Sequence, residues 1–369
     1  MKRTLTFFVV VITLVVLLAV ARSTQASSTV ASVSTDEFPK DLHDFAALDP
    51  IDAHVHLFNT DPAFVALLKS LRLHVVNIIV VDDKDGFEPG LPFRLRLGWS
   101  VVRVSEGHAL MCTSFDPFKF QEPTFAADAI RQMNQDFADG AIAVKIWKNV
   151  GMELKNREGR WVMPDDPVFE PIYKNIAAHD KTLIAHLAEP DGCWQPPDTP
   201  YLNCKNHPNW YMYGRKDAVS KATILAARDH LLEQNPKLRV VGAHLGSMET
   251  DVAEIAKRFD RYPNFAVDTA ARVRFLALQP RDKVRAFFLK YQDRILYGTD
   301  LDAFPNDMPV DGILKWQQTL LKEWRFFATD ETQEFQDRQV KGLKLPEPVL
   351  RKLYHDNAVR WIPGSNGQH

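Results

Sequence analysis

The amino-acid sequence predicts a single (β/α)8 barrel of the TIM type, an α/β fold in which helices surround eight parallel strands. Eight short apolar, β-branched runs recur along the chain, and each is followed by a segment with helical periodicity. In addition, six side chains that can bind a metal fall at or near the C-terminal ends of these runs. Functional groups of such barrels collect at that end, so both observations predict the same fold.

The predicted strands are short and mostly uninterrupted by charge. They are residues 50–57, 74–82, 109–115, 140–147, 182–188, 238–245, 265–270 and 294–299. Continuous apolar strands between helices are typical of a parallel sheet that is covered on both faces. Polar residues inside such strands cost stability unless they are paired or bind a ligand.

Capping residues predict where several helices begin. Thr124, Ser220 and Thr250 each precede a segment with an apolar stripe, and each is a predicted N-cap. Pro280 stands where the first turn of a helix tolerates proline. The stretch 87–104 has the least regular pattern.

The N-terminus is predicted to be an export signal that ends near residue 26. Lys2 and Arg3 precede an apolar run, and a small-residue cleavage site, Thr24-Gln-Ala, follows. The alternative is an uncleaved membrane anchor, because the run is close to the length that spans a bilayer. Both interpretations place the folded part outside the cytoplasm, in the periplasm or the extracellular space, and a cleaved signal leaves no stable membrane insertion.

The rest of the chain is predicted to hold one domain. Residues 27–48 lack periodicity and are predicted to be a tether, residues 49–363 form the barrel, and residues 364–369 form a C-terminal tail. The formal net charge is −2, and loss of the three basic residues of the signal makes it −5. This mild acidity gives no support to a nucleic-acid partner. The sequence does not fix the oligomeric state, and a homo-oligomer is compatible with it.

Three cysteines are too few for a disulfide framework to carry the fold. Cys112 lies in an apolar run and is predicted to be a buried small hydrophobe. Cys193 and Cys204 share one proline-rich segment and would pair in an oxidising compartment if their geometry permits. Neither has the CxxC spacing of a zinc site.

The candidate metal ligands come from five of the predicted strands. They are His54 and His56 in Asp-Ala-His-Val-His, Lys145 in Val-Lys-Ile-Trp, His186 in Ile-Ala-His, His244 in Gly-Ala-His-Leu-Gly and Asp300 in Tyr-Gly-Thr-Asp. Side chains two apart on a strand point the same way, so the first two can reach one cation together. Each residue alone has a structural alternative: the histidines can hydrogen-bond nearby loops, and Asp300 can cap a helix.

Lys145 is expected inside or at the lip of the barrel, where burial lowers the pKa of its amine and lets it react with carbon dioxide. The carbamate would be an anionic oxygen ligand able to bridge two divalent ions. The alternative is an ordinary lysine paired with an acid.

Taken together, these motifs resemble the amidohydrolase superfamily, in particular its broad amidohydrolase-related branch. The resemblance covers about residues 48–362 and includes the closing Leu353-Tyr-His-Asp-Asn-Ala-Val-Arg-Trp segment. It implies that His54, His56, His186 and Asp300 bind metal, with His244 as a second-metal ligand or a catalytic residue. Lys145 resembles the strand-four lysine of dihydroorotase and phosphotriesterase types, which favours two metals.

The expected reaction is hydrolysis of a C–N or C–O bond in a small carbonyl compound, such as an amide, lactam, lactone or ester. A metal-activated hydroxide would attack, and Asp300 would carry the proton to the leaving group. Zinc fits the histidine-rich ligand set best, as one or two ions. The alternatives are decarboxylation of an unsaturated or aromatic acid by a single metal, with His244 as acid and base, and a binding protein without turnover.

Substrate contacts are expected from the loops that follow the strands. The longest, from Pro190 to about residue 218, is rich in aromatic residues and is predicted to form a lid with Trp194 and Tyr211, or else to pack on itself. Arg272 is a candidate clamp for a substrate carboxylate, although it could pair with Asp268 or Asp302 instead.

Overall fold

The computed structural model describes residues 38–82, 90–199, 204 and 208–367. All of them fall within one compact unit, Ser32–His369. The predicted export signal, residues 1–26, lies outside the described residues. Among the helices in the described part of the chain, none is both long and apolar enough to cross a bilayer.

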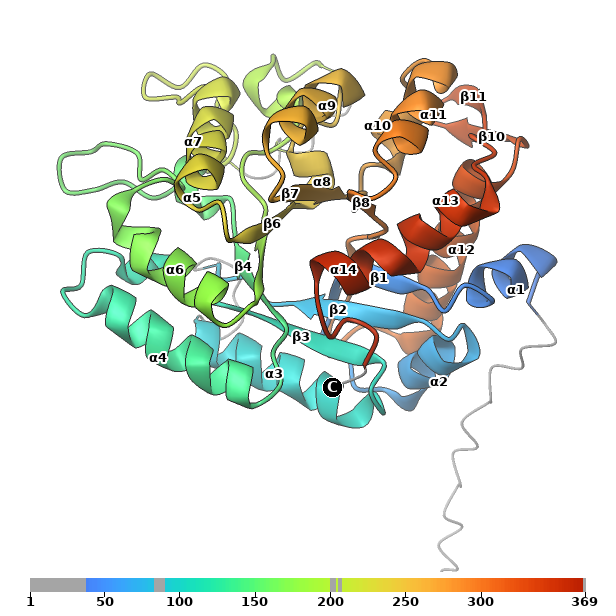
Figure 1. The fold of residues 1–369 in the computed structure, drawn as a ribbon, viewed down its shortest axis with the longest axis horizontal. Helices are drawn as coiled ribbons and strands as arrows, with labels where there is room; N and C mark the ends of the chain where they lie inside the picture. The colour runs from blue at the N-terminus through green and yellow to red at the C-terminus, as the bar shows by residue number, and fades with distance from the viewer. Residues whose placement is uncertain (1–37, 83–89, 200–203, 205–207, 368–369) are drawn as a thin grey trace, which may run out of the picture. The chain divides into compact units, whose positions relative to one another are not determined.

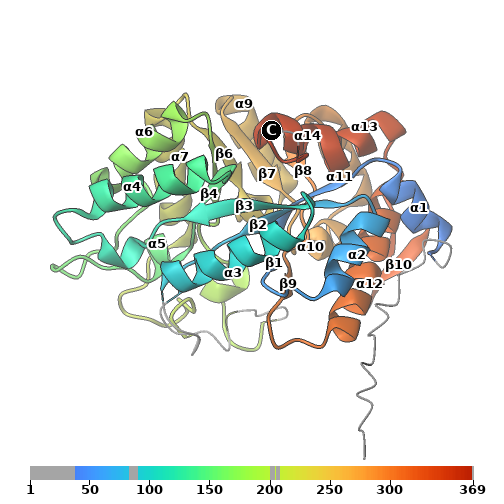
Figure 2. The ribbon, with the colours of Figure 1, turned by 90° about the horizontal axis from the view of Figure 1, so that it is seen from below.

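A parallel sheet curves through the centre of the protein, and helices cover its outer face (Figure 1; Figure 2). Its strand order is β8-β7-β6-β5-β4-β3-β2-β1-β9. The strands are β1 Ile51–Leu57, β2 His74–Ile78, β3 Ala109–Ser114, β4 Ala143–Ile146, β5 Thr182–Ala185, β6 Arg239–Gly242, β7 Phe265–Asp268, β8 Ile295–Leu296 and β9 Leu301–Ala303. Each predicted strand is therefore present, and the eighth is divided in two.

The divided eighth strand closes the barrel against β1. The backbone nitrogen of Ala53 donates to Tyr297 O (2.9 Å), and that of Asp300 donates to His54 O (2.8 Å). Leu301 in β9 then pairs with Val55. A Cβ atom on Gly298 would lie only 3.1 Å from the Cβ atom of His54, so glycine permits this close approach.

Helices follow most strands and pack on the outside of the sheet. They are α1 Lys40–Ala46, α2 Pro62–Ser70, α3 Leu91–Val104, α4 Phe125–Ala138, α5 Asn149–Met152, α6 Glu170–Ala178, α7 Lys221–Gln234, α8 Ala243–Gly246, α9 Val252–Arg261, α10 Val273–Ala277, α11 Arg281–Lys290, α12 Pro309–Ala328, α13 Glu347–Arg351 and α14 Asn357–Trp361. A hairpin of β10 Thr332–Phe335 and β11 Arg338–Lys341 follows α12.

One of the predicted helix caps is confirmed in full. The side chain of Ser220 accepts a hydrogen bond from the backbone nitrogen of Thr223 at the start of α7. Thr124 stands at the N-cap of α4, but its side chain caps no backbone nitrogen. The prediction for Thr250 was wrong by one residue, because Asp251 caps α9 and the Thr250 hydroxyl donates to Asp191 instead.

The segment predicted to be a tether is ordered in its last part, where α1 packs on the domain. Phe45 is fully buried and packs edge-on against Tyr297, Trp324 and Tyr354. The Asp41 carboxylate also accepts a hydrogen bond from Arg325 in α12 (2.7 Å). A helix of only seven residues shows little periodicity in the sequence, so its position was not predicted.

Alternating strand residues build the two main layers of the core. In β5, Leu183 and Ala185 belong to a large cluster with the surrounding helices. Ile184 belongs to a smaller cluster that includes Trp361 and Ile362 at the end of α14. The smaller cluster fills the barrel on the side of α14, so the opposite end is left for polar side chains.

A buried acid in the helical layer gives a prediction about stability. Glu323 in α12 accepts a hydrogen bond from the Tyr297 hydroxyl (2.9 Å), and burial raises the pKa of its carboxyl well above its usual range. A carboxyl group whose pKa is higher in the folded than in the unfolded protein makes its full contribution to the stability of the fold at pH values below the unfolded pKa. That contribution is lost as the pH rises. Glu323→Gln keeps an oxygen acceptor and does not titrate.

We therefore expect Glu323→Gln to raise the melting temperature at pH 7.5 by about 1–4 °C, with a smaller difference at pH 4.5. Thermal unfolding of both proteins across this range measures the effect. A variant that is less stable than the wild type at every pH would show that ionisation of the buried Glu323 carboxyl does not lower the stability of the protein at neutral pH.

Candidate metal centre

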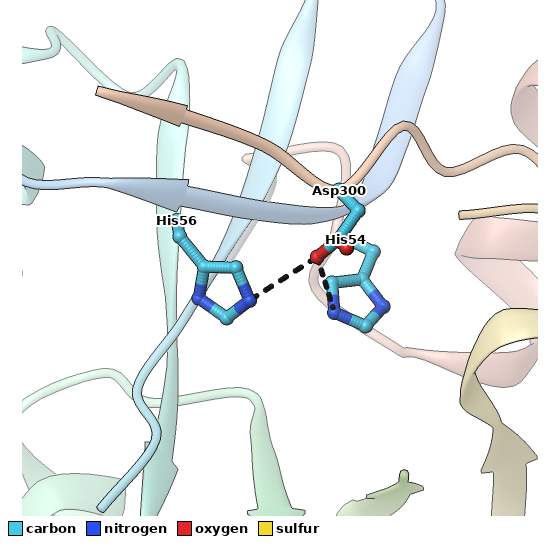
Figure 3. A group of neighbouring side chains, drawn as sticks. All are labelled: His54, His56 and Asp300. Carbon is cyan, nitrogen blue, oxygen red and sulfur yellow. Dashed lines mark ion pairs between the residues drawn. The ribbon is translucent and has the colours of Figure 1, made fainter. Parts of the chain in front are cut away.

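Three side chains converge where β1 meets the divided eighth strand. His54 Nε2 lies 3.5 Å and His56 Nε2 lies 3.4 Å from the same oxygen, Oδ1 of Asp300 (Figure 3). The three ligand atoms all lie within 4.8 Å of one another. Burial alone would raise the pKa of Asp300, but the contact with His56 and the positive charge nearby lower it to about 2, so the group is ionised.

The hydrogen bonds behind the two imidazoles fix which nitrogen faces Asp300. His56 Nδ1 lies 2.9 Å from the Ile78 carbonyl, which only accepts, so the Nδ1 atom carries the proton. His54 Nδ1 donates in the same way to the Asp268 carboxylate (2.8 Å). Burial holds the pKa of His54 well below its usual value, so its ring is neutral.

Two Nε2 lone pairs therefore face a carboxylate oxygen without a proton to share. Acceptor atoms that face one another in this way favour a cation between them, and imidazole nitrogens with a carboxylate are ligands that zinc and similar ions prefer. Hydrogen bonds from the opposite ring nitrogens are also the usual support of metal-binding histidines. The residues present fit a divalent metal.

Asp268, at the end of β7, orients two of the candidate ligands. Besides accepting from His54, its Oδ1 atom accepts from the backbone nitrogens of His244 (2.7 Å) and Ala270 (3.1 Å). Burial raises the pKa of Asp268 to about 6. From the sequence, Asp268 was predicted only as an alternative partner of Arg272. Its position at the end of an apolar strand, which resembles that of Asp300, is the feature that could have indicated a role in the site.

His244 follows β6 in a left-handed turn. Its φ is 59°, a conformation that costs a non-glycine residue about 1–3 kcal/mol and is most often kept at functional sites. Its Nδ1 atom lies 2.9 Å from Ala270 O, which leaves Nε2 without a proton. The ring centroid is 4.7 Å from that of His54 and 4.2 Å from that of His186.

His186 and Lys145 complete the predicted set beside the three converging side chains. His186 follows β5 directly, and its Nε2 atom is buried without a hydrogen-bond partner among the described residues. Lys145 in β4 is buried, with Nζ 3.3 Å from His54 Nε2, and burial lowers the pKa of its ammonium to about 8. The structure therefore places all six predicted residues at one end of the barrel.

The site opens into a cavity with two lobes that share Lys148, His186, Trp210, His244 and Asp300. The first lobe, of about 400 Å³, is also lined by His56, Phe58, Val80, Asp82, Arg94, Trp147, Asp302 and Phe304. The second, of about 340 Å³, is also lined by Glu189, Cys204, Ala271, Arg272 and Arg274. Both volumes suit a small molecule.

An ion pair on the cavity wall was not predicted. Lys148 is buried, donates to Glu189 Oε1 and lies over the ring of Trp210, 3.3 Å from its centroid. The sequence does not indicate this pair, because Lys148 and Glu189 follow different strands and meet only in the folded barrel.

Two of the predicted substrate contacts lie outside the cavity lining. The indole nitrogen of Trp194 donates to Val219 O (2.7 Å), and the Tyr211 hydroxyl donates to Gln195 O (2.8 Å). These bonds hold the long loop to itself. Among the described residues of the loop, Trp210 is the aromatic residue that lines the cavity. Arg272 does line the cavity, and it pairs with neither Asp268 nor Asp302.

Cys193 and Cys204 form a disulfide, with their Cα atoms 5.4 Å apart, while Cys112 is buried and free. Both bonded residues are buried, and Cys204 lines the second lobe. The bond therefore ties the long loop to the wall of the cavity.

Reduction of this disulfide is expected to destabilise the protein, because a loop closed over 11 residues of separation loses its cross-link, at a cost of about 2–3 kcal/mol. We expect dithiothreitol to lower the melting temperature of the wild type by a few degrees and to leave that of Cys193→Ser/Cys204→Ser unchanged. An equal response of both proteins would show that the bond contributes nothing.

The fold and the converging ligands define a TIM-barrel enzyme with a site suited to metal. More particularly, the chain belongs to the amidohydrolase family, because the model described as Amidohydrolase matches residues 121–363. Enzymes of this family act on small molecules and generally use a divalent metal. The resemblance seen in the sequence is thus confirmed.

Solved structures share the fold at low sequence identity. An uncharacterised TIM-barrel protein from Bordetella bronchiseptica is 15% identical, with a TM-score of 0.50, and the match covers 86% of this chain and 99% of that one. A probable 2-pyrone-4,6-dicarboxylic acid hydrolase from Acinetobacter baumannii is 11% identical (TM-score 0.47, coverage 85% and 99%). The 5-carboxyvanillate decarboxylase LigW from Sphingomonas paucimobilis is 15% identical (TM-score 0.48, coverage 85% and 99%). No curated protein matches the sequence.

Proposed function

We propose that the protein is a metal-dependent hydrolase that cleaves a C–N or C–O bond in a small carbonyl compound, such as an amide, lactam, lactone or ester. The observation that carries this proposal is the convergence of two unprotonated imidazole nitrogens and an ionised carboxylate on one point of the cavity wall. Imidazole nitrogens and a carboxylate that face one another in this way are typical of a site that binds a divalent cation.

His54, His56 and Asp300 are the proposed ligands of the first ion, and His186 completes the set, since its Nε2 atom is otherwise unpartnered. Zinc suits these donors best. A divalent ion bound here supplies a lowered pKa for water and a polarised substrate carbonyl.

Asp300 and His244 are the proposed proton carriers. Asp300 is ionised, and its side chain is 29% exposed to the cavity, so it can accept a proton from an attacking water and return it to the leaving atom. His244 has its Nε2 lone pair free, while its Nδ1–H bond to Ala270 O holds the ring in place. Trp147 and Trp210 line the cavity beside these residues.

Lys145 is the proposed ligand of a second ion after it reacts with carbon dioxide. A pKa of about 8 leaves roughly a tenth of the amine neutral at pH 7, and only the neutral amine attacks carbon dioxide. Its Nζ atom is 3.3 Å from His54 Nε2, so an added carboxyl group would stand among the other ligands.

A second candidate function is decarboxylation of an unsaturated or aromatic acid by a single metal, with His244 as acid and base. The observation that favours it is the compactness of the first ligand group, which has the size to hold one ion, while the Lys145 amine contacts His54 directly.

We further propose that the protein is exported, periplasmic or extracellular, with residues 1–26 as the signal. The Cys193–Cys204 disulfide supports this proposal, because such bonds persist in oxidising compartments. The N-terminal residue of the protein isolated from its host tests it: a mature chain that begins near residue 27 is expected, and a retained Met1 would favour an anchor.

The reaction is tested by assaying protein loaded with zinc or manganese against esters, lactones and amides, and against hydroxybenzoates with detection of carbon dioxide. Hydrolysis that disappears with a chelator and returns with metal is expected. Release of carbon dioxide without hydrolysis would favour the decarboxylase, and neither activity in any metal-loaded sample would overturn both.

A further inference from the structure

Two arginines in the second lobe have no anionic partner in the part of the chain that the structure describes. Arg272 is 5% exposed, its Nε atom has no hydrogen-bond partner among the described residues, and its Nη1 atom donates to the Ala271 carbonyl at 3.3 Å. The Nε atom of Arg274 is buried and unpartnered as well. Among the described residues, neither guanidinium has a carboxylate oxygen within ion-pair distance.

Two other buried cations in the same protein are compensated. Lys148 pairs with Glu189, and Arg228 pairs with Asp229 at 2.6 Å. Removing a charge from water without a partner is unfavourable, so buried ions are normally paired or hydrogen-bonded. Two unpaired guanidiniums side by side therefore indicate that an anion from outside the chain takes the place of the missing acid.

Their surroundings point to the substrate as the source of that anion. Both arginines line the second lobe together with His186, His244 and Asp300, so a group bound by them lies next to the proposed metal ligands. Phe275 supports both guanidiniums from behind, with ring centroid distances of 5.7 Å for Arg272 and 5.1 Å for Arg274.

We propose that Arg272 and Arg274 bind a carboxylate of the substrate, and that the first lobe holds an aromatic or other apolar body against Trp147, Trp210 and Phe304. The substrate class is thus a small carboxylic acid whose hydrolysable carbonyl group lies within a few bonds of the carboxylate. Planar guanidinium forks match the planar carboxylate in two-pronged hydrogen bonds. This inference rests on the proposed function for the chemistry, but not for the binding.

Binding is measured by quenching of tryptophan fluorescence, because Trp147 and Trp210 line the cavity. The probes are 4-nitrobenzoate and 4-nitrobenzamide, which differ only in the charged group, titrated into the purified full chain with and without zinc. We expect the carboxylate to bind at least about tenfold more tightly than the amide in both samples, because hydrogen bonds to charged groups are the stronger ones.

Arg272→Gln and Arg274→Gln are each expected to weaken 4-nitrobenzoate by about tenfold and to leave 4-nitrobenzamide unchanged. Arg272→Lys keeps the positive charge but lacks the two-pronged guanidinium, so its affinity for 4-nitrobenzoate should lie between those of the wild type and Arg272→Gln. Arg261→Gln is the matched control, since this arginine pairs with Glu233 on the surface. Melting temperatures show whether each variant is folded. If Arg272→Gln is not folded, the result for Arg274→Gln decides the test.

Equal affinity for the two probes, or carboxylate binding that needs zinc and ignores both arginines, would overturn the proposal. Displacement of 4-nitrobenzoate by inorganic phosphate at far lower concentration than by benzoate would assign the site to a phosphate instead. Selective binding of the carboxylate without any hydrolysis would contradict the proposed reaction but not this inference. Hydrolysis of neutral lactones, with binding of 4-nitrobenzoate unchanged in both arginine variants, would contradict this inference but not the proposed reaction.

Discussion

Asp300→Asn is expected to lower kcat/KM for hydrolysis by about 10²- to 10⁴-fold, the range typical for loss of a positioned proton carrier. The change keeps the size of the side chain and removes the charge that faces His54 and His56. It should also reduce the metal content, because one of three converging ligands is lost. Steady-state kinetics and elemental analysis of the same preparation measure both effects.

The control for this variant is Asp260→Asn, which removes a surface carboxylate hydrogen-bonded to Tyr291 on the outer helices. It should retain wild-type kinetics and metal. If Asp300→Asn kept full activity and metal, the converging ligands at the barrel mouth would not be the reactive centre.

Lys145→Ala is expected to lower hydrolysis by about 100-fold or more and to remove one of two metal equivalents, because the variant has no amine to form the carbamate. Lys145 is 1% exposed, and its amine lies within the group of proposed ligands, 3.3 Å from His54 Nε2. Kinetics and metal content measured side by side give the result.

Lys181→Ala, which lies before β5 and contacts Phe137, is the matched lysine control and should leave both quantities unchanged. Lys145→Ala with activity within a few-fold of the wild type, and with an unchanged single metal, would favour the mononuclear decarboxylase. Melting curves separate loss of the ligand from loss of folding.

The barrel could be predicted from the sequence because each strand is an apolar run that repeats before a helix. The strand ends were less predictable. His244 and Asp300 take left-handed conformations with φ of 59° and 63°, and no glycine marks either position. Both strands therefore end or break earlier than their apolar patterns suggest, and these breaks turn the two side chains into the cavity.

The ligand positions were predictable because strand ends of a parallel barrel meet at one rim, so chain order alone brought six residues together. What could not be predicted depends on contacts between distant loops. The role of Asp268 depends on its hydrogen bonds with His54 and His244, which join residues that are far apart in the sequence. Trp194 and Tyr211 were chosen for their aromatic character, but the loop uses their polar atoms to bind its own backbone.

The most direct test of the central claim is the number of divalent ions per chain, measured by elemental analysis on protein purified without chelator. We predict one or two equivalents in the wild type, two if Lys145 is carbamylated, and a clear loss in Asp300→Asn. A wild-type chain without metal, which neither binds added zinc or manganese nor gains activity from them, would contradict a metal-dependent enzyme.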